Sequence, residues 1–290
     1  MNHNASSPPW RDALLTACAP IIWGSTYIVT SEFLPPDRPF TAALIRTLPA
    51  GVLLLLFTRQ LPHKRFWWRL LILSALNIGV FQALLFVAAY RLPGGLAAVL
   101  GAIQPLLVML WVWTVDRRTP GGAALGCAIA GVFGMAMLLL SPQSALEPIG
   151  VMAALLGAAS MATGIWLTRR WQIGMPMLSL TGWQLMLGGL MLSPFALMVD
   201  APLPTLTFVH WTAYAYLSGA GALVAYVLWF RGVARLPSVA VASLGLLSPL
   251  TAVVLGWSFL GQSMTGVSLV GLLVVLSSVF GVQWTSSRNS

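Results

Sequence analysis

The chain has 290 residues, of which 58% are hydrophobic and only 7% are charged. An average globular protein has about 25% charged residues, so this chain has too few charges to cover a water-exposed surface. Disorder is also excluded, because disordered chains are polar and charged. The net charge of +9 does not indicate nucleic-acid binding, because the basic residues are scattered between apolar runs and are not clustered on a solvated face.

Ten apolar runs are long enough to cross a bilayer, for which a helix needs about 20 residues. In chain order the expected spans are 13–31, 40–58, 70–89, 93–115, 121–140, 149–168, 178–199, 211–230, 237–259 and 264–284. Short links rich in proline, glycine and charge separate them, and no remaining stretch is long enough for an aqueous domain. The sequence therefore predicts an all-α polytopic membrane protein with ten transmembrane helices.

Lysine and arginine are unevenly divided between alternate links. Twelve of the 15 basic residues fall on the side that holds both termini, Arg38 and Arg91 fall on the other side, and Arg46 lies within a span. Cytoplasmic loops of membrane proteins carry the excess of Lys and Arg. We therefore expect residues 1–12 and 285–290 to be cytoplasmic tails.

A sequence repeat relates two parts of the chain. Segment 91–122 matches segment 235–266 at a constant shift of 144 residues, and both begin with Arg-Leu-Pro. This predicts two five-helix repeats, 13–140 and 149–284, and because five is odd, the second repeat enters the membrane inverted. Inverted repeats are typical of transporters that hold their substrate near the midplane.

Several motifs identify a family. The Trp-Gly-Ser-Thr-Tyr motif at 23–27, the segment 42–46, and the prolines Pro105 and Pro249 resemble the EamA-type members of the drug/metabolite transporter superfamily over essentially the whole chain. Within it the chain is most similar to the YddG-like amino-acid exporters, a resemblance that implies a protein of the bacterial inner membrane. Many members carry Gly-Glu after the fourth and ninth spans, whereas this chain has Arg-Arg at 117–118 and Gly-Gln at 261–262. No role of that glutamate is therefore transferred.

Polar side chains within the spans are the first candidates for substrate binding, because each is costly in lipid and faces a cavity or another helix. Arg46 is the only charge well inside a span. It either binds a substrate carboxylate, or extends to the nearby boundary or caps helix carbonyls. Gln104 and Ser248 each precede a proline, which frees a carbonyl and kinks the helix. Gln104 either lines a cavity or bonds a neighbouring helix.

Aromatic residues supply the rest of the predicted site. Most of the 13 tryptophans flank spans and are expected to be interfacial anchors, but Trp23 lies near a span centre and Tyr27 follows one turn later. Asn77 and Phe81 are four residues apart and share a helix face. We expect a largely apolar cavity wall, and the full predicted substrate site comprises Trp23, Tyr27, Arg46, Asn77, Phe81, Gln82, Gln104, Trp166, Trp183 and Ser248.

The expected spans contain no Asp or Glu, and the three histidines lie in links or at a span end. Proton-coupled transporters use intramembrane carboxylates or histidines, so we expect movement driven by the substrate gradient. The sequence predicts a secondary exporter of amino acids, aromatic or apolar ones among them, or of similar small metabolites, acting by alternating access. A multidrug or other metabolite carrier of the same superfamily is the alternative.

An enzyme and a passive channel are the alternatives to a transporter. The spans carry no nucleophile with a base and no metal-ligand set, so we expect neither an enzyme nor a cofactor. A passive channel would lack saturable exchange. The expected partners are a small-molecule substrate and membrane lipid, without nucleic acid, and a monomer and a homodimer both remain open.

Overall fold

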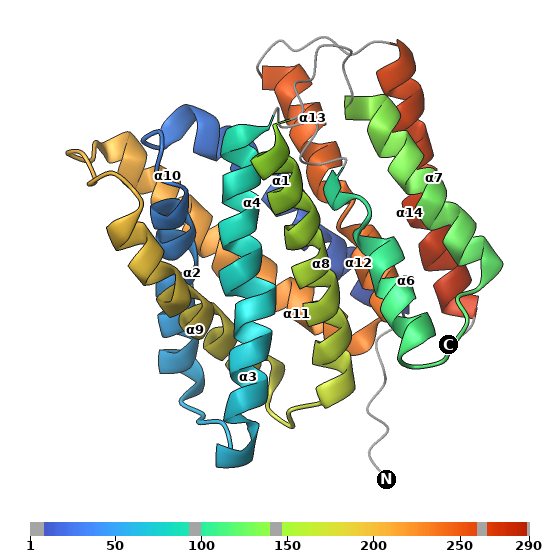
Figure 1. Ribbon diagram of the computed structural model, residues 1–290, viewed down its shortest axis with the longest axis horizontal. Helices are drawn as coiled ribbons and strands as arrows, with labels where there is room; N and C mark the ends of the chain where they lie inside the picture. The colour runs from blue at the N-terminus through green and yellow to red at the C-terminus, as the bar shows by residue number, and fades with distance from the viewer. Residues whose placement is uncertain (1–8, 93–99, 140–146, 260–265, 289–290) are drawn as a thin grey trace.

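The computed structural model describes residues 9–92, 100–139, 147–259 and 266–288. Within these ranges the chain forms helices and no strands, and the helices pack side by side in one bundle (Figure 1). The helical segments are α1 (Pro9–Phe33), α2 (Pro39–Thr58), η1 (Lys64–Phe66), α3 (Trp67–Ser74), η2 (Ala75–Gly79), α4 (Val80–Arg91), α6 (Gln104–Thr114), α7 (Gly122–Leu139), α8 (Pro148–Trp171), α9 (Met177–Met198), α10 (Phe208–Ser218), η3 (Gly219–Val224), α11 (Ala225–Arg235), α12 (Ser238–Leu244), α13 (Leu247–Phe259) and α14 (Gly266–Arg288).

Eight helical stretches in the described ranges are long and apolar enough to cross a membrane. Each corresponds to one of the expected spans, with α3, η2 and α4 forming one stretch and α10, η3 and α11 another. Two shorter apolar helices, Gln104–Thr114 and Gly122–Met137, lie within the fourth and fifth expected spans. Residues 93–99 and 140 of those spans lie outside the described residues. The prediction of a polytopic, all-helical membrane protein therefore agrees with the fold.

The first helix begins earlier than the sequence indicates. We expected residues 1–12 to form a tail, but α1 starts at Pro9, a residue whose fixed φ favours the first turn of a helix. Asp12 therefore lies in the first turn of α1, where it is 6% exposed. Residues 9–12 are thus helical, and arginines on α11 pair with this carboxylate and allow it to be buried.

Two helix pairs lie at opposite sides of the bundle. Figure 1 shows α2 beside α9 on one side and α7 beside α14 on the other, and both pairs are in extensive contact. Glycines permit these close approaches: a Cβ at Gly51 would lie 2.3 Å from the backbone nitrogen of Met186, and one at Gly134 would lie 2.8 Å from Val274 Cγ1. Close backbone contact through small residues is the usual way in which membrane helices associate.

Two π-helical segments interrupt long helices. η2 joins α3 to α4, and η3 joins α10 to α11. Their first residues, Ala75 and Gly219, are 144 positions apart, which is the shift of the sequence repeat. A π-turn disturbs the regular helical hydrogen bonding and often marks a functional site.

The kinks expected at Pro105 and Pro249 are complete breaks in the helix. Turn residues 102–103 precede α6, and residues 245–246 separate α12 from α13. Each proline then falls in the first turn of the following helix, where its missing N–H has no intrahelical partner to lose. Irregular backbone thus lies in the middle of both twin segments.

Candidate substrate site

A buried carbonyl of η3 binds two side chains from other helices. The Gly221 oxygen accepts a hydrogen bond from Trp23 Nε1 of α1 at 2.9 Å and another from Arg46 Nη2 of α2 at 3.1 Å. Arg46 is only 3% exposed. Its guanidinium therefore caps a helix carbonyl inside the bundle, which is one of the roles considered for it.

An aromatic group continues this site along α11. The Trp23 ring lies 5.0 Å from Tyr226 and 5.1 Å from Trp229, measured between centroids. The Tyr226 hydroxyl is hydrogen-bonded to Gln82 Nε2 of α4. Tyr226, Trp229 and Gln82 are each at most 1% exposed. Four helical segments thus meet here: α1, α2, α4 and the η3–α11 helix.

Two polar atoms in this group have no hydrogen-bond partner within the described part of the chain. They are the acceptor Gln82 Oε1 and the donor Trp229 Nε1. A buried polar group without a partner costs about 1–3 kcal/mol. Such atoms therefore favour a ligand or water that supplies the missing bonds.

Asn77 belongs to a second, separate cluster. Its Nδ2 donates to Gln184 Oε1 of α9 at 2.7 Å and to Thr168 Oγ1 of α8 at 3.1 Å. Asn77 and Gln184 are fully buried, and Thr168 is 8% exposed. Gly164 makes room for Asn77, since a Cβ there would lie 2.0 Å from Asn77 Oδ1. This cluster joins η2 to α8 and α9.

Two more predicted residues, Phe81 and Ser248, pack near the first group, and Gln104 lies at a helix break. Phe81 is partly buried against the core that includes Tyr226. The Ser248 carbonyl touches α1, since a Cβ at Gly24 would lie 2.5 Å from it. Gln104 begins α6, and its Nε2 is buried without a hydrogen-bond partner among the described residues. The side chain of Tyr27 lies outside what the structure describes.

The residues around the Gly221 carbonyl form what we call the central group, which comprises Trp23, Arg46, Gln82, Gly221, Tyr226 and Trp229. Trp166 and Trp183 lie away from the central group, towards the end of the bundle where α2 and α8 finish. We call it the basic end, since Arg59 and Arg170 lie there. Trp166 Nε1 donates to Asp116 Oδ2 at 2.7 Å. Trp183 Nε1 donates to the backbone oxygen of Gln60 at 2.9 Å. Sequence placed both indoles in one cavity wall with Trp23, but the structure does not bring them together with it.

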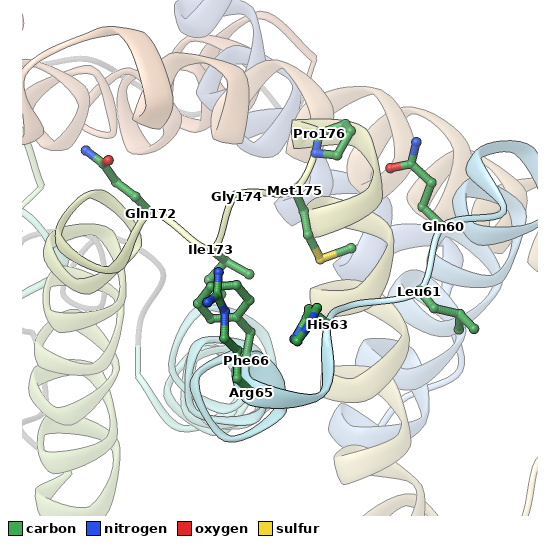
Figure 2. Close-up of a pocket in the computed structure, with 10 residues that line it drawn as sticks. All are labelled: Gln60, Leu61, His63, Arg65, Phe66, Gln172, Ile173, Gly174, Met175 and Pro176. Carbon is green, nitrogen blue, oxygen red and sulfur yellow. The ribbon is translucent and has the colours of Figure 1, made fainter.

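A surface cavity of about 490 Å³ also opens at the basic end. Figure 2 shows it between the link from α2 to α3 and the link from α8 to α9. It contains none of the predicted site residues, and it is lined by Gln60, Leu61, His63, Arg65, Phe66, Gln172, Ile173, Gly174, Met175 and Pro176. No sequence pattern indicated a cavity there.

No group of three or more His, Cys, Asp or Glu side chains that could hold a metal occurs within the described ranges. The chemistry of the central group is instead hydrogen bonding, aromatic contact and one guanidinium. Such a group suits the binding of a small molecule.

Sequence reasoning missed Gly221, Tyr226 and Trp229. The repeat would have found two of them, since the shift of 144 residues leads from Asn77 to Gly221 and from Gln82 to Tyr226. Trp229 had no comparable signal, because sequence position alone placed it near a span end.

The model of the EamA-like transporter family matches residues 10–140 and again residues 148–284. The chain belongs to the EamA-like transporter family. It is therefore a multi-pass membrane protein and a transporter of a small-molecule substrate.

Relatives of this EamA-like transporter match along nearly its whole length. Protein PecM of Dickeya dadantii (strain 3937) is 45% identical over 268 residues, which cover 91% of this chain and 90% of PecM. The uncharacterized inner membrane transporter YedA of Escherichia coli (strain K12) is 27% identical over 266 residues, which cover 89% and 86%. One solved crystal structure matches with a TM-score of 0.78 over 97% of this chain and 99% of the other, at 17% identity. That likeness shows the fold alone.

Proposed function

We propose that this EamA-like transporter exports amino acids, among them aromatic or apolar ones, or similar small metabolites, as a YddG-like member of the superfamily. The observation that carries the proposal is the central group, in which Arg46 and the polar atoms of Gln82 and Trp229 lie among aromatic rings. A multidrug carrier or a carrier of another metabolite is the alternative.

The central group offers complementary chemistry for a zwitterion. Arg46 supplies a guanidinium, which forms the stronger, charge-assisted kind of hydrogen bond with a carboxylate. Gln82 Oε1 supplies a buried acceptor for an ammonium group. Trp23, Tyr226 and Trp229 present large aromatic surfaces that favour an apolar or aromatic side chain.

We further infer ten spans arranged as inverted repeats of residues 13–140 and 149–284. Two separate matches to one family model, 10–140 and 148–284, support this arrangement. So does the hydrogen bond between Gln82 and Tyr226, which occupy equivalent positions in the two repeats. The excess of Lys and Arg on one side supports cytoplasmic termini in a bacterial inner membrane.

The proposal includes transport driven by the substrate gradient. In the described helices, acidic side chains lie only near the ends: Asp12 is in the first turn of α1, and Glu32 is next to the last residue of α1. Arg231 and Arg235 both pair with Asp12. If an imposed proton gradient, with the membrane potential clamped, accelerated substrate uptake into sealed vesicles, this part of the proposal would be wrong.

The decisive experiment is counterflow in liposomes. Purified protein is given radiolabelled L-tryptophan, L-leucine or L-lysine, with tryptamine as a competitor that lacks the carboxylate. We expect saturable exchange of tryptophan and leucine and weak competition by tryptamine. Exchange of none of the amino acids, together with transport of lipophilic cations, would favour the multidrug alternative.

Two variants link that transport to the central group. Arg46→Gln keeps a donor for Gly221 but loses the charge, so we expect a fall in tryptophan exchange of roughly 10- to 100-fold, the value of a charged hydrogen bond. Trp23→Ala is expected to abolish most exchange, whereas Trp257→Ala, whose side chain is 55% exposed, is the matched control and should transport normally. Normal exchange by well-folded Arg46→Gln and Trp23→Ala would contradict this site.

A further inference from the structure

An aromatic and ionic cluster joins α6 to α8 at the basic end, and we call it the α6–α8 clasp. It comprises Trp111, Asp116, Thr163, Trp166 and Arg170. The carboxylate accepts from Trp166 Nε1 on one oxygen, at 2.7 Å, and from Arg170 Nη1 on the other. Trp111 Nε1 donates to Thr163 Oγ1 at 3.0 Å, and its ring stacks on Trp166 with centroids 5.7 Å apart.

Local structure explains why these groups meet. Thr163, Trp166 and Arg170 are spaced by three and four residues and so share one face of α8. Asp116 lies two residues after Thr114, the last residue of α6, and is positioned by a turn in which Arg117 has φ 56°. The Arg118 N–H then donates back to the Val112 carbonyl at 3.2 Å. The turn holds the carboxylate beside α8.

Two other ion-pair sites in the described ranges are equivalent to each other in the sequence repeat. Arg91, the last residue of α4, pairs with Glu147 before α8 at 3.1 Å. Arg235, the last residue of α11, pairs with Asp12 at the start of α1 at 3.4 Å. Since the two arginines are related by the shift of 144 residues, each repeat makes the same kind of contact with the first helix of the other.

The clasp lacks such an equivalent. The shift of 144 residues leads from Asp116 to Leu260, which carries no charge and cannot form this ion pair. In an inverted repeat, equivalent contacts lie at opposite ends of the bundle. A contact that only one end can make stabilises the conformations in which the helices at that end stay together.

We propose that the α6–α8 clasp is the closing contact of the transport pathway at the basic end and must break when that end opens. The inference rests on the proposed transport function, with the alternating access expected from the sequence, and not on the identity of the substrate. The cluster joins the two halves of the chain, as a closing contact must. Its Arg170 and Asp116 side chains are 46% and 26% exposed, and ion pairs that water reaches are weak enough to open reversibly.

This proposal gives Trp166 a different role from the one expected from sequence. Its indole N–H and ring face are occupied by Asp116, Trp111 and Arg170, whose guanidinium lies 5.2 Å above the ring. Trp166 is therefore a positioning residue that holds the closed end, not part of the substrate-binding wall.

The test measures the distance between the ends of α6 and α8. Spin labels are attached at Arg118→Cys and Gln172→Cys in a chain that also carries Cys18→Ser and Cys127→Ser. We expect Asp116→Asn to raise the ratio of long to short distances by roughly twofold to fivefold, the range that a partly exposed ion pair supports. Trp166→Phe, which keeps an aromatic ring but removes the indole N–H and part of the ring area that contacts Trp111, should act in the same direction.

Matched variants make the result decisive. Arg91→Gln breaks the ion pair to Glu147, whose exposure is similar, and should leave the distances unchanged. The exchange Asp116→Arg with Arg170→Asp should return the ratio towards that of the unmodified pair. Identical distance distributions in Asp116→Asn, Trp166→Phe and the parent would overturn the proposal, as would an equal effect of Arg91→Gln. Because no substrate is needed, a failed amino-acid assay would not affect this result.

Discussion

The π-segments η2 and η3 occupy equivalent positions in the repeat but bind different partners. In η2 the Leu76 carbonyl accepts from Ser160 Oγ at 2.8 Å, and Asn77 bonds to neutral side chains on α8 and α9. In η3 the Gly221 carbonyl accepts from an indole and a guanidinium. A π-helical segment thus lies among uncharged hydrogen-bonding side chains in one half and beside a guanidinium and aromatic rings in the other.

One residue type accounts for much of this difference. Asn77 fills the space beside its own segment, whereas its equivalent in the repeat is Gly221. A Cβ at Gly221 would lie 3.4 Å from Thr26 Cγ2 and 3.7 Å from Arg46 Nε. These are ordinary contact distances, so only a side chain longer than a Cβ would compete for space with the side chains from α1 and α2. We therefore expect substitutions around η3 to affect mainly transport and substitutions around η2 to affect mainly stability.

The largest expected effect is on stability at η2. In Gly164→Ala the new Cβ would lie 2.0 Å from Asn77 Oδ1, so Asn77 must move and lose its bonds to Gln184 and Thr168. We expect a loss of about 1–3 kcal/mol, as for other overpacked sites, seen as a lower midpoint of thermal unfolding in detergent. Gly126→Ala is the control, because nothing lies within 4 Å of a Cβ there. Equal midpoints for the two variants would show that the η2 cluster is not tightly packed.

A smaller effect is expected on transport at η3. Trp23→Phe keeps an aromatic ring but removes the indole N–H that binds Gly221, and we expect tryptophan exchange to fall by roughly tenfold, the equivalent of one hydrogen bond. Ser160→Ala removes the corresponding donor at η2 and should change exchange by less than about twofold. If Ser160→Ala reduced exchange as much as Trp23→Phe, the two segments would not differ in function.

The smallest expected effect is the coupling free energy between Gln82 in the first half and Tyr226 in the second. Gln82→Leu, Tyr226→Phe and the double variant form a cycle on the one hydrogen bond that joins these equivalent positions. Interhelical hydrogen bonds in a membrane contribute about 0.6 kcal/mol on average, and we expect a coupling of that order in unfolding measurements. If the double variant lost exactly the sum of the unfolding free energies lost by the two single variants, this hydrogen bond would not contribute to holding the halves together.

Much of the fold could be predicted from the sequence, but less of the site could. Hydropathy alone defines spans, because every backbone polar group in lipid must be satisfied within a helix. Side-chain proximity has no such local signal. Trp23, Arg46 and Gln82 come from three helices and lie close together in the structure, whereas Trp166 and Trp183 were added only because they lie inward of a boundary.

Sequence determined the membrane class, the polytopic helical architecture and the repeat, since these follow from composition, span length and a shift that can be counted along the chain. Only the tertiary structure decided which polar groups are already used and by which partners. It showed that Arg46 binds the Gly221 carbonyl, that Asp12 is buried by pairing with arginines on α11, and that Trp166 binds Asp116. The physical reason is that a hydrogen bond or ion pair depends on distances between helices far apart in the chain, and no local pattern records those distances.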